Sequence, residues 1–309
     1  MNTPYDIAFV GHYTKDTIVS QRGTRLVHGG ACNYGSNVAV RAGLKVAAIS
    51  RLAKEDQGVV ESLKSSGIEV FVTYTEYSTC LRLEYPTDNP DIRMMFVTSS
   101  AGAFTPGEVK DITAKAFVLG PSLHGEINLE VLEELRKKDT TIACDVQGYV
   151  RADVDSKVEY VAWDTEEMKA VLSRIDVLKT DAVEAEMITG EADKKRAAQI
   201  LTSYGPKEVV LTHRDGVLVY ADTLCYDAKF TPKEMIGRSG RGDTCIGAYM
   251  TKRLSASAEE ACIWAAAVTS LKIEAEGPFK RNIREVDEKI RKDYSELSSY
   301  VIMNTCCLF

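Results

Sequence analysis

The chain has 309 residues, a formal net charge of −7 and an isoelectric point near 5.3. This acidic balance disfavours nucleic acid or an acidic membrane surface as the main partner. No apolar run approaches the ~20 residues that span a bilayer, and the first residues lack the basic-then-apolar pattern of a secretion signal. The sequence therefore predicts a cytoplasmic globular protein with room for one large α/β domain or two smaller ones.

Eight cysteines and four histidines are scattered through the chain, without a Cys-x-x-Cys pair. We interpret the cysteines as reduced, small apolar residues, and we expect neither a zinc site nor a disulfide framework. The last four residues, Cys306 to Phe309, have the form of a prenylation box. No polybasic segment precedes them as a second membrane anchor, so we interpret them as a short apolar tail.

The first predicted strand, at residues 7–11, is an apolar run that ends in glycine. Asp16 follows five residues later, near the carboxyl end of the strand, where α/β sheets bind ligands; a solvated turn is the simpler alternative. Gly29 and Gly30 then open a helix of small residues that continues to Gly43. Two glycines at the start of a helix allow the backbone to approach a ligand closely.

A second strand is expected at residues 46–50 and a helix at residues 57–66. Between residues 70 and 97 apolar and polar residues alternate, as in Leu81, Leu83 and Tyr85 against Arg82 and Glu84. This alternation predicts short antiparallel strands with one polar face. The segment is either an elaborated edge of the main sheet or a lid that closes over substrate and excludes water.

From residue 106 onward, strands and helices alternate regularly, which predicts a doubly wound, mainly parallel α/β sheet. Ligands of such a sheet bind at the carboxyl ends of its strands, where polar residues follow: Asp145 and Gln147, Asp181 and Glu184, and Thr212 and Arg214. A hairpin is expected at residues 217–220 and 225–229, and an apolar helix at 258–274 should pack behind the segment that follows that hairpin. The other expected strands are 116–120, 141–145, 177–180 and 209–212, and the other expected helices are 129–138, 166–172, 181–189 and 194–204.

The most informative segment is GRSGRGDT at residues 237–244, which places three glycines within six residues before a helix of small residues. Its N–H groups can face one way and bind an anion at the helix N-terminus. Asp243 at that position can act as a general base beside a phosphoryl group in transfer. An equally simple alternative is that Asp243 only caps the helix.

Several well-known motifs are absent from the sequence. It has no Walker A motif, no glycine triplet with dinucleotide spacing after the first strand, and no Gly-x-Ser-x-Gly elbow. The residues alone therefore indicate an α/β enzyme that handles an anion. Because a base stands beside the predicted anion site, a phosphoryl group is the favoured anion.

Residues 240–244, GRGDT, resemble the GAGDT signature of the ribokinase-like (PfkB) carbohydrate kinases, and Gly29-Gly30 with its helix is similar to the first signature of that family. The two matches occur in the order of the family, and the strand pattern between them agrees over nearly the whole chain. Within the family, DVQGYVR at residues 145–151 and GRSGR at 237–241 resemble the myo-inositol kinase branch. The resemblance implies a single ribokinase-like domain over residues 1–309, with β-lid segments near residues 12–28 and 70–98.

The resemblance also implies an ATP- and Mg²⁺-dependent kinase that phosphorylates a hydroxyl of a small polyol or sugar, with myo-inositol as the first candidate. Asp243 would take the proton from the acceptor hydroxyl. The N–H groups from Gly240, Arg241 and Gly242 to Asp243 would hold the γ-phosphoryl group of the donor. Direct in-line transfer is expected, because no activated nucleophile is evident for a phospho-enzyme.

Glu184 would organise Mg²⁺ near the phosphates, as the glutamate of the family's Asn-x-x-Glu motif does. Asp181 replaces the asparagine of that motif, either as a metal ligand or as a helix cap, and we favour the cap. The remaining candidates divide between the two substrates. They are Asp16, Gly29, Gly30, Tyr34, Gln147 and Arg151 for the polyol, and Lys179, Asp181, Thr212 and Gly216 for the nucleotide.

Two residues depart from the family pattern. Tyr34 stands where an asparagine usually reaches the substrate, so the acceptor cannot be transferred from ribokinase or fructokinase. Arg241 replaces an alanine; it either adds positive charge for the phosphate or points away into an ion pair, and we favour the added charge. A nucleoside kinase and a non-catalytic sugar or nucleotide sensor stay open as alternatives, as does a homodimer formed through the β-lid.

Overall fold

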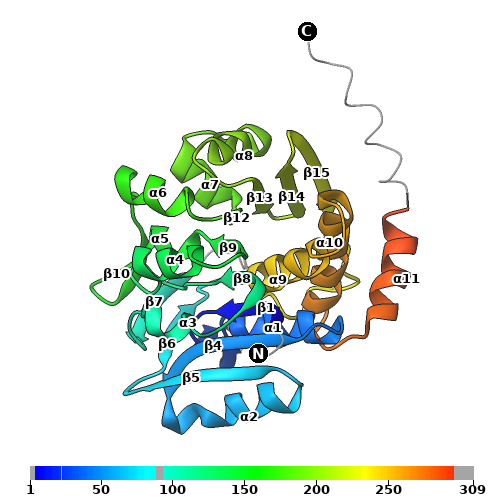
Figure 1. The fold of residues 1–309 in the computed structure, drawn as a ribbon. Coiled ribbons are helices and arrows are strands. Elements are labelled where there is room, and N and C mark those ends of the chain that lie inside the picture. The colour runs from blue at the N-terminus through cyan, green and yellow to red at the C-terminus, as the bar shows by residue number, and fades with distance from the viewer. Residues whose placement is uncertain (1–3, 22, 88–92, 296–309) are drawn as a thin grey trace.

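The computed structural model describes residues 4–21, 23–87 and 93–295. These residues form a large sheet with helices on both faces and a smaller sheet beside it (Figure 1). The strands of the large sheet are β1 (Tyr5–Val10), β4 (Val46–Ala53), β5 (Glu69–Thr75), β8 (Ala114–Leu119), β9 (Thr141–Asp145), β12 (Val177–Asp181), β13 (Glu208–Thr212), β14 (Gly216–Ala221) and β15 (Leu224–Lys229).

The strand order of the large sheet is β15-β14-β13-β12-β9-β8-β1-β4-β5. All neighbours from β13 to β5 are parallel, and the pairs β13–β14 and β14–β15 are antiparallel. The order reverses on either side of β1 and β8, which is the doubly wound arrangement that places a ligand crevice at the carboxyl ends of the central strands. The predicted fold class is therefore confirmed.

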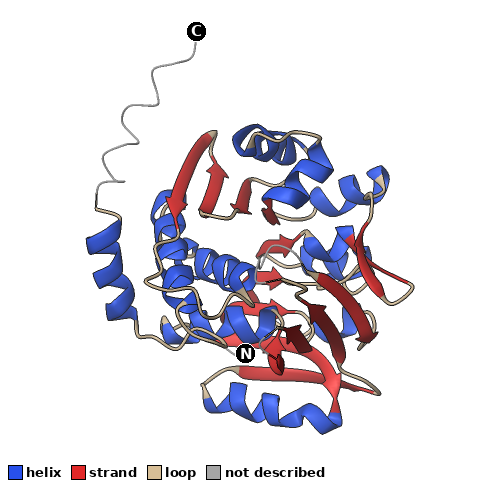
Figure 2. Ribbon diagram, turned by 180° about the vertical axis from the view of Figure 1, so that it is seen from behind, coloured by secondary structure: helices blue, strands red, loops and turns tan. Residues whose placement is uncertain are grey.

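Side chains of the central strands alternate between two cores. In β1, Ile7 and Phe9 belong to one core and Ala8 and Val10 to the other, and all four are fully buried. Because both faces are covered, these strands are continuous apolar runs. Figure 2, in which strands are red and helices blue, shows helices on both sides of the strands.

The helices divide between the two faces. Side chains of α1 (Ala31–Arg41), α9 (Arg241–Arg253), α10 (Ala258–Ile273) and α11 (Ile283–Asp293) share one core. The short α3 (Pro106–Val109), α4 (Leu129–Arg136), α5 (Gln147–Val150), α6 (Thr165–Leu172), α7 (Ala182–Thr189) and α8 (Lys194–Ser203) share the other. At the edge, a 3₁₀ turn (Lys54–Asp56) leads into α2 (Gln57–Ser65), which packs on β5.

The smaller sheet has the order β10-β11-β7-β6-β2-β3. Its strands are antiparallel to their neighbours except for the parallel pair β2 and β6. Leu81, Leu83 and Val97 pack on one of its faces together with Leu123 from the large unit. The strands are β2 (Thr14–Ser20), β3 (Gly23–Gly29), β6 (Thr79–Glu84), β7 (Met94–Ser99), β10 (Arg151–Val154) and β11 (Lys157–Tyr160).

One strand expected in the β-lid lies elsewhere. Residues 70–75 belong to β5, which pairs with β4 at the edge of the large sheet. The alternation of apolar and polar residues is the same for a half-covered edge strand as for a lid strand, so the pattern could not separate the two. The expected boundary of the β-lid near residue 70 is therefore wrong: residues 70–75 form the edge of the main sheet, the alternative left open above, and the small-sheet part of the segment begins with β6.

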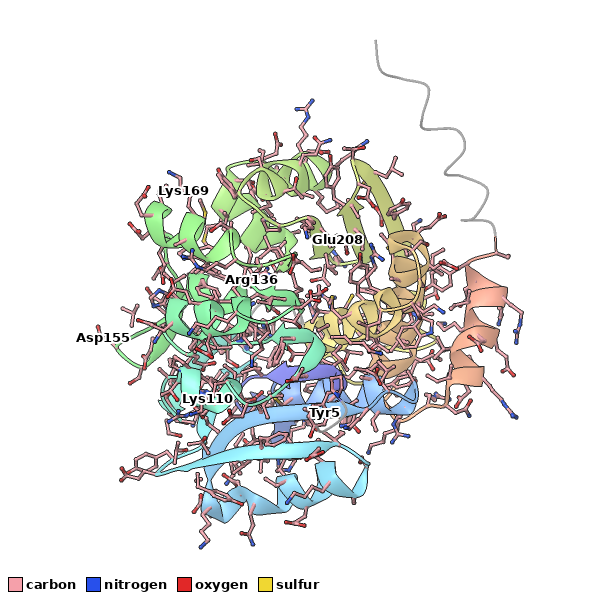
Figure 3. The ribbon with its side chains drawn as sticks, viewed as in Figure 1. Tyr5, Lys110, Arg136, Asp155, Lys169 and Glu208 are labelled. Atoms are coloured by element: carbon pink, nitrogen blue, oxygen red, sulfur yellow. The ribbon has the colours of Figure 1, made fainter. Side chains whose placement is uncertain are left out.

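The hairpin of β10 and β11 has no counterpart among the predicted elements. Its turn residues, Asp155 and Ser156, have φ angles of 50° and 67°, the left-handed pair of a type I′ turn. Such turns usually carry glycine, and without it the hairpin left little trace in the sequence. Asp155 lies at the periphery of the molecule (Figure 3).

Within the described residues, no helix is long and apolar enough to cross a membrane. The six cysteines of this part of the chain are all free thiols, as expected. Residues 306–309, which resemble a prenylation box, lie outside the described residues.

Candidate active site

A cavity of about 230 Å³ lies between the carboxyl ends of the central strands and the small sheet, and we call it the central cavity. It collects predicted residues from segments far apart in the sequence. Of the predicted site residues, only Gly216 and Glu184 are not in its wall. The predicted residues that line it are Asp16, Gly29, Gly30, Tyr34, Gln147, Arg151, Lys179, Asp181, Thr212, Gly240, Arg241, Gly242 and Asp243.

The N-terminus of α9 points into this cavity. Gly240 is the N-cap and has a left-handed φ of 72°, a conformation that favours glycine. The first helical bond runs from Thr244 N–H to the Gly240 carbonyl, so the N–H groups of Gly242 and Asp243 precede any carbonyl of the helix that could accept from them. They are available to an anion at the positive end of the helix.

Asp243 is not the cap of this helix. It is the third helical residue, and no side chain caps the helix. Its side chain is partly buried in the wall of the central cavity. Burial raises the pKa of Asp243, while the nearby cations Lys179, Arg151 and Lys272 oppose the shift. A desolvated carboxylate with a raised pKa is suited to accept a proton from a hydroxyl.

Asp16, on β2, forms the opposite side of the cavity. A Cβ atom on Gly29 would clash with the hydroxyl of Thr14 and would lie 2.9 Å from Asp16 Oδ2, so the glycine leaves room for this carboxylate. Oδ1 of Asp16 is buried without a hydrogen-bond partner. Burial, with a smaller contribution from Asp243, raises the pKa of Asp16 to about 7. An unpartnered buried oxygen at a cavity wall is the acceptor that a substrate hydroxyl requires.

Lys179 lies on the floor of the central cavity. Its ammonium group is 2.9 Å from Asp145 Oδ2, and both side chains are almost fully buried. A Cβ atom on Gly242 would lie 3.0 Å from Lys179 Nζ, which shows how closely the lysine approaches the turn. Burial lowers the pKa of Lys179, but the carboxylates of Asp145, Glu184 and Asp181 outweigh that effect, so the group stays charged.

Arg151 connects the central cavity with the residues predicted for the metal. Its guanidinium group donates to Glu184 Oε1 at 2.7 Å and to Gln147 Oε1 at 2.8 Å. The other oxygen of Glu184 accepts from the backbone N–H of Asp181 at 2.9 Å, and Asp181 caps α7 in return. The structure confirms Asp181 as a cap, and it places Arg151 beside Glu184 as well as at the predicted polyol pocket.

The donor set bears on Mg²⁺. The described residues contain no group of three or more His, Cys, Asp or Glu side chains that could hold a metal ion. Both oxygens of Glu184 are engaged, and its side chain is fully buried. Asp181 is about 29% exposed and lines the cavity. A carboxylate of this kind fits Mg²⁺ only together with water and the phosphates of a substrate, which is the usual manner of Mg²⁺ binding.

A second cavity of about 700 Å³ continues from the central one, and we call it the cationic cleft. Arg93, Met95, Arg151, Asp181, Thr212, Arg238 and Arg241 line both. Six Lys or Arg side chains and one Asp border the cleft, so its charge suits a polyanion. The six cations are Arg93, Arg151, Lys157, Arg214, Arg238 and Arg241.

Half of these cations were not among the candidates from the sequence. Arg93 and Lys157 lie on separate segments and belong to no motif, and Arg238 was noted only as part of a motif match, whereas Arg214 was expected at the crevice from its place after a strand. The predicted residue Gly216 lines neither cavity. A Cβ atom there would clash with the Ala228 carbonyl, so Gly216 serves the close pairing of β14 and β15.

Known proteins share this arrangement. A sequence model of the pfkB family carbohydrate kinases matches residues 4–283. The chain belongs to the pfkB family. The cytidine kinase of Thermococcus kodakarensis is 27% identical over 267 residues, which are 84% of this chain and 92% of that protein.

Two solved structures of pfkB-type fold are more similar still. A pyrophosphate-dependent kinase in the ribokinase family, in a sulfate complex, has a TM-score of 0.84 and 32% identity, covering 92% of this chain and 100% of that one. A pyrophosphate-dependent kinase of the same family, complexed with a pyrophosphate analog and myo-inositol, has a TM-score of 0.83 and 31% identity, covering 91% and 99%. The resemblance to pfkB kinases and to the inositol kinase branch is confirmed, and the chain is a kinase of this family.

Proposed function

We propose that this kinase transfers a phosphoryl group from inorganic pyrophosphate to a hydroxyl of myo-inositol. The observation that carries the proposal is the partly buried carboxyl group of Asp243 in the wall of the central cavity, with Asp16 in the same wall and the cationic cleft adjoining it. The pyrophosphate-dependent neighbours described above support the choice of both substrates.

The acceptor is proposed to bind in the central cavity. Asp16 accepts hydrogen bonds from hydroxyls of the ring, and Leu81 and Leu83 of the small sheet give an apolar wall for its C–H groups. Asp243 then takes the proton of the reacting hydroxyl while the oxygen of that hydroxyl attacks the phosphorus atom of the donor. A non-catalytic sensor would not need this base, which costs free energy to bury.

The donor is proposed to bind in the cationic cleft with its transferred phosphoryl group at the N-terminus of α9. The N–H groups of Gly242 and Asp243 and the ammonium of Lys179 stabilise the charge that develops there. Arg214 and Lys157 bind the leaving phosphate. Mg²⁺, carried in by the donor phosphates beside Asp181, would neutralise further charge.

ATP, which the sequence resemblance implied, is the second candidate donor. One observation favours it: Met94, Tyr160 and Val183 are exposed large apolar side chains, and all three line the cationic cleft. A nucleobase can pack on such side chains, whereas pyrophosphate has no apolar part. The two donors thus differ in whether the apolar rim of the cleft contributes to binding.

The test crosses donors with acceptors. Purified protein with Mg²⁺ receives pyrophosphate or ATP together with myo-inositol, ribose, fructose, fructose 6-phosphate, adenosine or cytidine, and products are identified by ³¹P NMR. We expect turnover with pyrophosphate and myo-inositol, and its loss in Asp243→Asn. Turnover only with ATP would make ATP the donor in place of pyrophosphate. Turnover only with a nucleoside would refute the assignment of a polyol as the acceptor.

A further inference from the structure

Lys272, in the last turn of α10, is a buried cation that the mechanism above does not use. Its side chain is about 2% exposed. It donates hydrogen bonds to the main-chain carbonyls of Gly237, at 2.7 Å, and of Ser239. Both acceptors belong to residues 236–240, which lead into α9 and which we call the anion-binding turn. A buried ammonium group satisfied by main-chain carbonyls, instead of by a carboxylate, holds backbone in place.

The same end of α10 fixes the turn at a second point. The N–H groups of Ile236 and Gly237 both donate to the Ile273 carbonyl at 2.9 Å. A Cβ atom on Gly237 would clash with the Ala275 carbonyl, so the two backbones are in close contact. The start of the anion-binding turn is therefore attached to the main chain of α10, and Lys272 attaches the part nearest to α9.

The direction of the Ser239 carbonyl determines the direction in which the N–H of Gly240 can donate a hydrogen bond. In a trans peptide the C=O and the N–H of the next residue point in opposite directions. When Lys272 holds the Ser239 carbonyl, the N–H of Gly240 must point away from Lys272. Ser239 and Gly240 both line the central cavity, so Lys272 fixes the orientation of a peptide that belongs to the cavity wall.

The ring of Tyr34, on α1, packs directly against the anion-binding turn. The Lys272 ammonium lies 4.9 Å from the centre of the Tyr34 ring, within the range of a cation–π contact. A Cβ atom on Gly240 would clash with the same ring, so Gly240 lies directly against it. Lys272, the ring and Gly240 form one packed group, whose position is fixed by the lysine on one side and α1 on the other.

We propose that Lys272 is a positioning residue for phosphoryl transfer. Its buried ammonium group orients the anion-binding turn and supplies a fixed positive charge behind it, without contact with either substrate. The inference rests on phosphoryl transfer at Asp243 as proposed above. It goes further because it assigns a catalytic consequence to a residue outside the glycine-rich motif.

Electrostatics agrees with the geometry. Burial lowers the pKa of Lys272 to about 8, and Glu276 and Asp243 oppose that shift. Lys272 in turn lowers the pKa of Asp243, along with Lys179 and Arg151. Without the charge of Lys272, Asp243 would bind its proton more tightly and would be ionised only at higher pH. Asp16 and Asp145 also face this group of charges, and both are retained in the variants below.

The first experiment compares two buried lysines. Lys289, on α11, is about 9% exposed, donates to the Thr231 carbonyl at 2.6 Å, and lines neither cavity. We expect Lys272→Met to lower kcat about 100-fold, as for the loss of one oxyanion-hole group, with both KM values within about threefold of wild type. Lys289→Met should lower the melting temperature while leaving kcat within about threefold. Equal losses of kcat in the two variants would overturn the proposal.

The second experiment distinguishes a positioning role of Lys272 from a purely structural role. The acid limb of kcat/KM should move to higher pH in Lys272→Met and not in Lys289→Met. In Lys272→Ala, methylammonium added to the assay should recover at least tenfold in kcat, because the two carbonyls and the ring remain as a cation site. No rescue together with an unmoved acid limb contradicts the proposal. Absence of turnover in the wild type with any donor and acceptor is a different result, and it refutes the proposed function instead.

Discussion

The two cavities of this kinase share a wall and differ in chemistry. The central cavity has Asp16, Asp243 and leucines of the small sheet, which the cationic cleft lacks, whereas the cleft has six cations and one carboxylate, and four of those cations line both cavities. A neutral polyol is bound by acceptors and apolar surface, and a polyanion by cations. The difference lies at the two ends of the site: Asp16 and Asp243 line only the central cavity, and Lys157 and Arg214 line only the cleft.

The largest expected effect on activity comes from a change at Asp243, the carboxyl group beside the boundary between the two cavities. We predict that Asp243→Asn lowers kcat about 10³-fold, within the range of a general base. The donor should bind as in the wild type, because the amide keeps the size of the side chain and the cations of the cleft are unchanged. Rapid-quench kinetics and calorimetric titration of the donor measure the two quantities. Activity within tenfold of wild type would show that another group takes the proton.

A change at Arg151 tests whether the residues between the two cavities also stabilise the fold. Its guanidinium group pairs with Glu184, whose side chain is fully buried. Arg151→Met should lower the free energy of unfolding by about 3 kcal/mol, because an uncompensated buried carboxylate is left behind. Adding Glu184→Gln to Arg151→Met should recover part of that loss. Denaturant unfolding measures both effects.

A matched arginine serves as the control for Arg151. Arg253 pairs with Glu208 at 2.9 Å, but its side chain is about 33% exposed. Arg253→Met should therefore cost about 1 kcal/mol or less, as for a solvent-screened ion pair. Equal costs for the two arginines would show that burial of Glu184 does not set the energy.

A change at Arg214 tests whether the cationic cleft binds the donor. Arg214→Ala should raise the KM of the donor about tenfold, since one charge-assisted contact is lost, and should leave the KM of the acceptor unchanged. Lys169→Ala is the control, because Lys169 is an exposed cation on α6 that pairs with Glu166 (Figure 3). If both variants alter the donor KM equally, long-range charge and not the cleft explains donor binding.

The same contrast explains how much of the site the sequence revealed. Asp243, Gly240 and Gly242 are adjacent in the chain, so the glycine spacing and the carboxylate identified one end of the central cavity. The central strands were found because burial on both faces requires continuous apolar runs. These features are local, and local features are what a sequence pattern contains.

The cationic cleft could not be found in this way. Arg93 and Lys157 come from separate segments, and each alone is an ordinary surface cation. Lys272 stands in the last turn of a helix, where lysine is common because it complements the helix dipole. Only the packing of α10 against the anion-binding turn gives it a role. The hairpin that carries Lys157 was missed for a related reason, since its turn lacks glycine.

The smallest predicted effect concerns pH and belongs to the acceptor side alone. Burial, with a smaller contribution from Asp243, raises the pKa of Asp16 to about 7, and the hydrogen bond with Thr14 and the charge of Arg93 oppose the shift. The ionised form accepts hydroxyl hydrogens, so the Kd of the acceptor should about double between about pH 8 and about pH 7 as half of the carboxylate is protonated. Donor affinity should change less over this interval, because the arginines of the cleft stay charged.

Stability changes with the opposite sign. The folded state holds the proton of Asp16 more tightly than the unfolded chain, so this group lowers the free energy of unfolding as pH rises from about 4 through about 7. Asp16→Asn should remove that decline and also flatten the pH dependence of acceptor binding, which equilibrium unfolding and calorimetric titration can follow separately. An Asp16→Asn variant that keeps the wild-type pH dependence of acceptor binding would assign that titration to Asp243. The acceptor side would then depend on one carboxylate and not on two.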